Sequence, residues 1–148
     1  MQDFNLFVAN FRSLVQEIDA NGGASVWTNF DKLNELPITE VLNKVSTGYS
    51  VGNNNYSSII TDWNCLSKEQ RFEQLIAACL DTSIRYEINN SEFPCLGFWL
   101  DTNTARVYVD PITHVEVLAD AMNLGSANGE LAIWDISLGR EIKLKSVA

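Results

Sequence analysis

The chain has 148 residues, of which 46% are hydrophobic and 10% aromatic, so it can build a core without disulfides or a metal ion. This hydrophobicity excludes intrinsic disorder. The 19 acidic residues outnumber the 10 lysines and arginines, giving a net charge of −9 that is spread over both halves of the chain. Because nucleic-acid binders carry a basic surface, this balance argues against direct nucleic-acid binding.

The sequence does not predict a signal for export or for insertion into a membrane. Asn5, Asn10 and Arg12 interrupt any apolar run at the start of the chain, and no stretch approaches the roughly 18 apolar residues of a membrane span. The three cysteines are odd in number and widely spaced, which is typical of free thiols in a reducing compartment. We therefore expect a cytoplasmic protein that does not associate with a membrane.

The first element in the chain is an amphipathic helix. Apolar side chains repeat at helical spacing between Phe4 and Ile18. Asp3 is placed to cap the start of this helix, and Asn21-Gly22-Gly23 is placed to end it. The pattern predicts a helix from about Asp3 to Ala20.

The apolar face of this helix has two interpretations. If it packs on the core, Phe7, Phe11 and Leu14 are among its most buried residues, and the polar Asn10 lies largely off that face. If it instead binds a partner protein or a second copy of the chain, Phe4, Phe7 and Phe11 form the contact surface.

The next part of the chain has shorter and more broken patterns. A short strand is expected around Val26-Trp27. Residues 33–45 read as one broken helix or two joined helices, with the break near Leu36 because Pro37 pushes the residue before it out of helical geometry. Residues 48–56 predict a strand and a turn that lead to a further strand at Ile59-Ile60.

A second long helix begins at a capping box, Ser67-Lys68-Glu69-Gln70. Cys79 falls on its apolar face, so we interpret this cysteine as a small core residue and not as a nucleophile. From Ser83 the apolar period changes to two, which predicts a strand over Ile84 to Ile88 that Asn89-Asn90 ends.

The last third of the chain predicts a first hairpin. Leu96 to Leu100 and Arg106 to Val109 pair across the turn at residues 101–104, and Asp110-Pro111 closes the hairpin. Thr113 and Glu116 then have the spacing of a capping box.

The helix that this capping box predicts runs to about Asn128, and a second hairpin follows it. Residues 131–134 and 141–144 form the strands of that hairpin. Each hairpin has an Asp five residues before an Arg, at Asp101 and Arg106 and again at Asp135 and Arg140, so we expect the Asp to close the turn and the Arg to start the return strand.

These elements together predict an α+β fold. N-terminal helices come first and are followed by an antiparallel sheet of hairpins with one crossing helix. No linker rich in Pro, Gly or Ser divides the chain, so residues 1–148 are expected to form a single domain.

Residues 99–142 also carry a resemblance. They contain Tyr-Val-Asp at 108–110, a predicted helix, and Gly-Glu-Leu-Ala-Ile-Trp-Asp at 129–135. This stretch, about a third of the chain, resembles a module of short uncharacterised proteins of bacteriophages and other mobile elements. The resemblance implies a bacterial or phage setting, and hence the host cytoplasm, but it implies no activity.

Residues that could carry catalysis or a metal ion are few. His114 is the single histidine, and at the predicted helix entrance we expect it to be a plain surface residue. Asp62, Asp101, Asp110 and Asp135 would form an acid/base or magnesium cluster if strand ends met at one edge, although aspartates at strand ends mostly bond their own turns. The cysteines and His114 lack the paired spacing of a zinc site. We expect no cofactor and no metal ion.

The sequence thus favours a non-enzymatic, acidic protein-binding or inhibitor protein. Its carboxylates would attract a partner with a basic surface, a host protein if the chain is phage-encoded, and its aromatic side chains would anchor that partner. Two alternatives stay open: a small hydrolase or nucleotide-processing enzyme that uses the strand-end aspartates, and a virion structural or assembly component with the N-terminal helix at a subunit interface. The expected binding residues are Phe4, Phe7, Phe11, Trp99, Asp101, Trp134 and Asp135.

Overall fold

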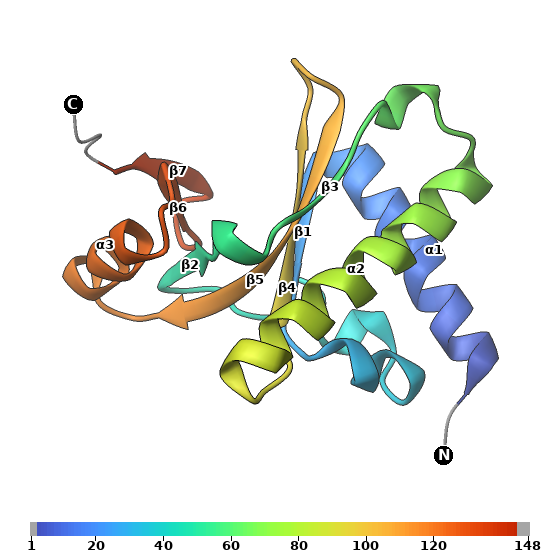
Figure 1. The fold of residues 1–148 in the computed structure, drawn as a ribbon, viewed down its shortest axis with the longest axis horizontal. Coiled ribbons are helices and arrows are strands. Elements are labelled where there is room, and N and C mark those ends of the chain that lie inside the picture. Colours follow the sequence, from blue (N-terminus) through green and yellow to red (C-terminus); the bar gives the residue numbers. More distant parts are fainter. Residues whose placement is uncertain (1–2, 145–148) are drawn as a thin grey trace.

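The computed structural model describes residues 3–144 and has the α+β fold that the sequence predicts. Its strands form one antiparallel sheet that curls into a half-barrel (Figure 1). The strand order is β1-β4-β5-β2-β6-β7, and β3 pairs with β5 beside β2. The strands are β1 (Gly23–Val26), β2 (Tyr49–Gly52), β3 (Ser58–Ile60), β4 (Cys95–Asp101), β5 (Arg106–Val115), β6 (Ala132–Asp135) and β7 (Arg140–Lys143).

The first helix, α1 (Phe4–Asn21), confirms the prediction closely. The Asp3 side chain accepts a hydrogen bond from the Leu6 amide at 3.0 Å and caps the helix start. Gly22 ends it in the left-handed conformation, with a φ of 79° that glycine adopts without strain. Phe11 and Leu14 are fully buried, whereas Phe7 is half-buried.

The position of Asn10 corrects the sequence analysis, because this side chain is buried on the core side of α1 and not off it. Its amide nitrogen donates to the carbonyls of Leu33 and Leu36 at 2.9 and 2.8 Å, and its oxygen accepts from the Ile38 amide at 2.8 Å. Asn10 therefore satisfies three backbone groups around Pro37 that would otherwise lack partners in the interior.

The segment around Pro37 breaks as predicted, but it forms short 3-10 helices at Phe30–Asn34 and Ile38–Glu40. A third helical turn, at Asn54–Tyr56, separates β2 from β3, and a fourth at Trp63–Cys65 precedes α2. The predicted strand, turn and strand over residues 48–60 are confirmed.

The second helix, α2 (Lys68–Asn90), begins at the predicted capping box and is longer than predicted. The strand expected over Ile84 to Ile88 is wrong, because the helix continues through it. Ile84 and Ile88 are four residues apart, so they also fit one face of a helix, and both are exposed. Cys79 is fully buried, as expected.

Strand β5 corrects the sequence analysis a second time. It does not end at Asp110-Pro111 but runs on to Val115, where it pairs with β2. The carbonyl of Pro111 accepts a hydrogen bond from the Asn53 amide, at the point where β2 has ended and β3 has not yet begun. Proline is tolerated here because its missing N–H falls at this break in the sheet.

The extension of β5 moves the start of the third helix, α3, to Leu118–Ala127. The predicted capping box at Thr113 and Glu116 is therefore wrong, and Val117 precedes the helix without a side-chain cap. His114 lies in β5 and not at a helix entrance.

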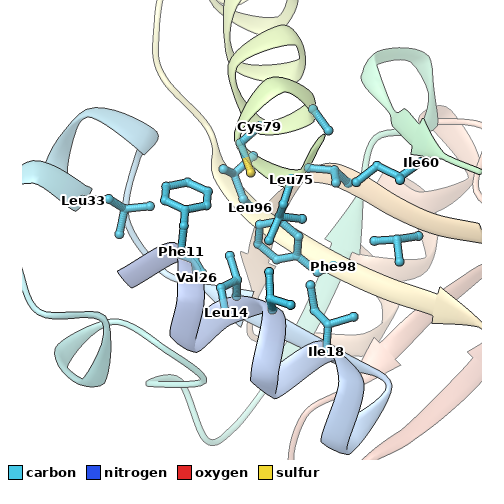
Figure 2. Close-up of a cluster of buried hydrophobic side chains, with 14 of the residues drawn as sticks. Phe11, Leu14, Ile18, Val26, Leu33, Ile60, Leu75, Cys79, Leu96 and Phe98 are labelled. Carbon is cyan, nitrogen blue, oxygen red and sulfur yellow. The ribbon is translucent and has the colours of Figure 1, made fainter. Parts of the chain in front are cut away.

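Two apolar cores lie on one side of the sheet. In the larger core, α1 and α2 cover β1, β4, β5 and β3, and Figure 2 shows Phe11 and Leu14 of α1 beside Leu96 and Phe98 of β4. In the smaller core, α3 covers β2 and β6 through Ala121, Val51, Ile133 and Leu144. In the part of the chain that the structure describes, no helix has the length and apolar character needed to cross a bilayer.

Alternate residues of β5 point to the opposite side of the sheet, which we call the open face. Val107 and Val109 point to the helices and are fully buried, so Tyr108 and Asp110 between them point to the open face. Antiparallel partners point to the same side, so Trp99 of β4 lies there beside Tyr108. Within residues 3–144, all three α-helices pack against the other side.

Candidate functional site

The open face carries a row of three neighbouring side chains: Ile59, Tyr108 and Trp99. We call it the aromatic row after the rings of Tyr108 and Trp99. The three residues are neighbours in the register of β3, β5 and β4. The rings of Trp99 and Tyr108 stack with their centroids 5.4 Å apart and an interplanar angle of 26°. Trp99 is 55% exposed and Ile59 is 52% exposed. Exposed apolar side chains that lie together mark a binding surface more often than single exposed apolar residues do.

Two carboxyl groups lie next to this row, here called the carboxyl pair: Asp110 and Glu130. Asp110 is two positions along β5 from Tyr108 and accepts a hydrogen bond from the Ser57 hydroxyl. Glu130 comes from the loop after α3 and reaches over Gly52, the last residue of β2. A Cβ at position 52 would collide with the Glu130 Oε1 atom, so glycine is what allows this close approach.

The electrostatics of the carboxyl pair favour the protonated form. Burial raises the pKa of Asp110, and the hydrogen bond from Ser57 opposes that rise. Burial, together with the nearby charge of Asp110, raises the pKa of Glu130 to about 7. Within residues 3–144 no basic side chain forms an ion pair with either group. A cation that approached the pair would therefore favour its ionised form, because these residues supply no compensating positive charge.

A second aromatic group lies further along the open face. The His114 ring packs edge-on against Trp27 with centroids 5.8 Å apart, and its Nε2 atom lies 2.7 Å from the Thr47 carbonyl oxygen. Trp134 of β6 shares a register position with Ser50, whose other neighbour is His114. Aromatic side chains thus occur at both ends of the open face, with the carboxyl pair between them.

The seven residues expected to bind a partner fall in different places. Phe4 is exposed at the start of α1, and Phe7 packs edge-on against Phe30 beneath it. Trp99 and Trp134 are exposed on the open face. Phe11 and Asp135 are buried, so neither offers its side chain to a partner. These two residues therefore leave the set of expected binding residues.

The two hairpin aspartates act as turn residues, in the way that the sequence indicates. Asp101 accepts a hydrogen bond from the Asn103 amide at 3.0 Å, and Asp135 accepts one from the Leu138 amide at 3.2 Å. Each shares a register position with the arginine five residues later. In residues 3–144 no three His, Cys, Asp or Glu side chains are grouped to hold a metal ion.

The cysteines are poorly suited to nucleophilic chemistry. Burial raises the pKa of Cys79 well above its ordinary range, and burial with the nearby Glu92 charge raises the pKa of Cys95. A raised pKa disfavours the thiolate, which is the reactive form. Cys65 is exposed, and it is a free thiol like the other two.

No family model, curated protein or solved structure matches this chain. The site is therefore defined by its geometry alone. The sequence did not predict that Ile59, Tyr108, Asp110 and Glu130 lie near Trp99. The alternation of Val107 to Asp110 was the available signal, but it identifies the exposed side of β5 only once the pairing partners are known.

Proposed function

We propose that the protein is a non-enzymatic binding protein that captures a protein partner on the open face of its sheet. The observation that carries the proposal is the aromatic row, in which Trp99 and Tyr108 stack while Trp99 stays more than half exposed. Aromatic anchors of this kind supply much of the affinity at protein interfaces. A phage-encoded protein of this type would act as an inhibitor of a host protein.

The partner is expected to present a basic side chain flanked by apolar groups. The carboxyl pair lies beside the aromatic row, and no basic side chain of residues 3–144 is ion-paired with it. An Arg or Lys of the partner would neutralise the pair while its aliphatic stem covers Tyr108. The net charge of −9 would speed encounter with a basic surface, and salt would slow it.

Affinity capture with matched baits tests this function. The wild-type protein and a Trp99→Ala/Tyr108→Ala variant are used as baits in a lysate of the native host. A Leu138→Ala variant serves as the control, because Leu138 is exposed in the β6–β7 turn. We expect a partner that the wild type and the control retain, and that the double variant binds roughly 30-fold or more weakly. A partner retained equally by all three baits would contradict the proposal.

An enzyme remains the second candidate function, because one observation favours it. The pKa of Glu130, raised to about 7 beside Asp110, suits a general acid or base near neutral pH. This candidate is a small hydrolase or nucleotide-processing enzyme that uses the carboxyl pair in place of the hairpin aspartates. It predicts that Glu130→Gln abolishes turnover of a nucleotide or ester substrate while leaving the melting temperature intact. A protein without such turnover, with the partner still bound, supports the binding function.

A further inference from the structure

The strand edges of the sheet differ in how they are protected. An unpaired edge is a template for another strand, and proteins normally cover it or place charges on it. Along the outer edge of β1, Leu42 pairs with Val26, and the Asn43 amide donates to the Ser25 carbonyl at 2.7 Å. At the other end of the sheet, β7 carries charged side chains at three of its four positions: Arg140, Glu141 and Lys143. Both of these edges are protected.

The outer edge of β3 is protected only just before its start, where the Arg85 guanidinium donates to the Ser57 carbonyl at 2.9 Å. β3 pairs with β5 on one side only, and beyond β5 nothing in residues 3–144 hydrogen-bonds to the backbone of Ile59 or Ile60. Both side chains are uncharged, and Ile59 is exposed. This edge is therefore open to pairing.

A groove runs along this open edge, between β3 and α2, which pass side by side in Figure 1. Its volume is about 470 Å³, and its lining on the α2 side includes Gln74, Ala77 and Ala78. The small alanines leave room for a chain beside the strand. A helix wall set next to a free strand edge is the arrangement into which extended peptides add as an extra strand.

The charge in the groove is placed at one end. Asp81 is the charged residue of the lining, and it accepts a hydrogen bond from the Ser58 hydroxyl at 2.8 Å. That bond and the one from Arg85 lower the pKa of Asp81, so its carboxylate is ionised. Asp81 forms an ion pair with Arg85 at 3.0 Å, and the bonds from Ser58 and Arg85 all end on its Oδ2 atom. Its side chain is 58% exposed, so a basic group can still approach the Oδ1 atom from the groove.

We propose that the open edge of β3 takes up an extended segment of the protein partner as an additional strand, in the groove between β3 and α2. This inference deepens the proposed function and rests on it, because Ile59 belongs both to this edge and to the aromatic row. Alternate side chains of the segment lie beside Ile59 on the open face and over Ala77 in the groove. The segment is free of proline, rich in small or β-branched residues, and basic at the end that meets Asp81.

A randomised heptapeptide library displayed on yeast tests this inference. Peptides are selected on the purified protein and then measured against two variants. Ala77→Trp fills the groove from an exposed position of α2, and Ala127→Trp places the same bulk on an exposed position of α3. We expect selected peptides with alternating β-branched residues and a terminal Lys or Arg. Their affinity falls more than about tenfold in Ala77→Trp and is unchanged in Ala127→Trp.

The outcomes separate the inference from the proposed function. Peptides that lose affinity in Trp99→Ala but bind Ala77→Trp normally would overturn strand addition and leave the open face as the binding surface. Peptides that lose affinity in Ala77→Trp and not in Trp99→Ala would support strand addition and count against the aromatic row. A library that yields no binder, or binders indifferent to both substitutions, would overturn the inference.

Discussion

The two faces of the sheet use the same strands for different purposes. On the covered face, Leu96, Phe98, Val107 and Val109 meet α1 and α2 and are almost entirely buried. On the open face, Trp99 and Tyr108 alternate with them and stay in contact with solvent. Stability and the proposed binding thus depend on adjacent residues that point in opposite directions. Substitutions on one face should therefore leave the property of the other face largely intact.

The largest expected effect is on the covered face. Phe11→Asp removes a fully buried ring and places an unpaired charge among apolar side chains, so it should cost at least about 4 kcal/mol of stability. Phe4→Asp is the matched control, because Phe4 is on the same helix and 76% exposed. Thermal melts should separate the two variants widely. An unchanged melt for Phe11→Asp would disprove the core position, and dissociation of an oligomer without loss of stability would favour a subunit interface on α1.

The next prediction compares neighbouring residues on β4. Phe98→Ala should cost about 3–4 kcal/mol, because this ring is only 5% exposed in the larger core. Trp99→Ala should cost about 1 kcal/mol, the value of an aromatic pair at the surface. Urea unfolding measures both values. The loss of affinity for the partner should show the reverse order and be larger for Trp99→Ala than for Phe98→Ala. Equal losses of stability would contradict the assignment of these two residues to different faces.

The loss expected from Asn10→Ala lies between those of Phe98→Ala and Trp99→Ala. The substitution leaves the Leu33 and Leu36 carbonyls and the Ile38 amide without partners, at a cost of about 2–3 kcal/mol. Asn5→Ala, at an exposed position of the same helix, is the control. If urea unfolding finds both variants as stable as the wild type, the Asn10 hydrogen bonds contribute nothing to the covered face.

Prediction from the sequence succeeded where local signals agree with one another. Asp3 and Gly22 bound α1, and Ser67 and Gln70 begin α2, because cap chemistry depends on residues close together in the chain. It failed where a local signal has two meanings. Ile84 and Ile88 fit a strand or one helix face, and Pro111 is compatible with a strand at a break in the sheet.

The candidate site was less predictable than the fold. Trp99 stands out in the sequence as an aromatic residue in a hairpin, and it is indeed exposed. Its neighbour Ile59 comes from a strand about 40 residues earlier, and Glu130 reaches Asp110 from a separate loop. Only the three-dimensional pairing of β3, β5 and β4 brings these residues together. The burial of Phe11 decides between the two interpretations of its helix face, and the burial of Asp135 could not be predicted from a charged residue in a turn.

A pH dependence of stability is also expected from the carboxyl pair. The pKa of Glu130 is raised from 4.5 to about 7 in the folded protein, so between these values the folded state holds more protons than the unfolded state. Its contribution is fully present below pH 4.5 and is lost as the pH rises through about 7. The raised pKa of Asp110 acts in the same direction.

Glu130→Gln isolates this contribution, because it keeps the shape of the side chain and removes the titration. Urea unfolding from pH 4 to 8 should give a difference between wild type and variant that shifts in favour of the variant as the pH rises. A pH-independent difference would mean that Glu130 titrates as an ordinary surface carboxyl, and its side chain would then already be ionised at pH 6 to 7.

Hydrogen–deuterium exchange of the protein with its captured partner distinguishes binding on the open face from binding at the N-terminal helix. If the open face is the binding surface, bound partner should slow exchange of the backbone amides of β4 and β5 around Trp99 and Tyr108, while amides at the start of α1 around Phe4 exchange as in the free protein. Slowed exchange confined to the start of α1, with β4 and β5 unaffected, would contradict the account and assign the partner to the N-terminal helix.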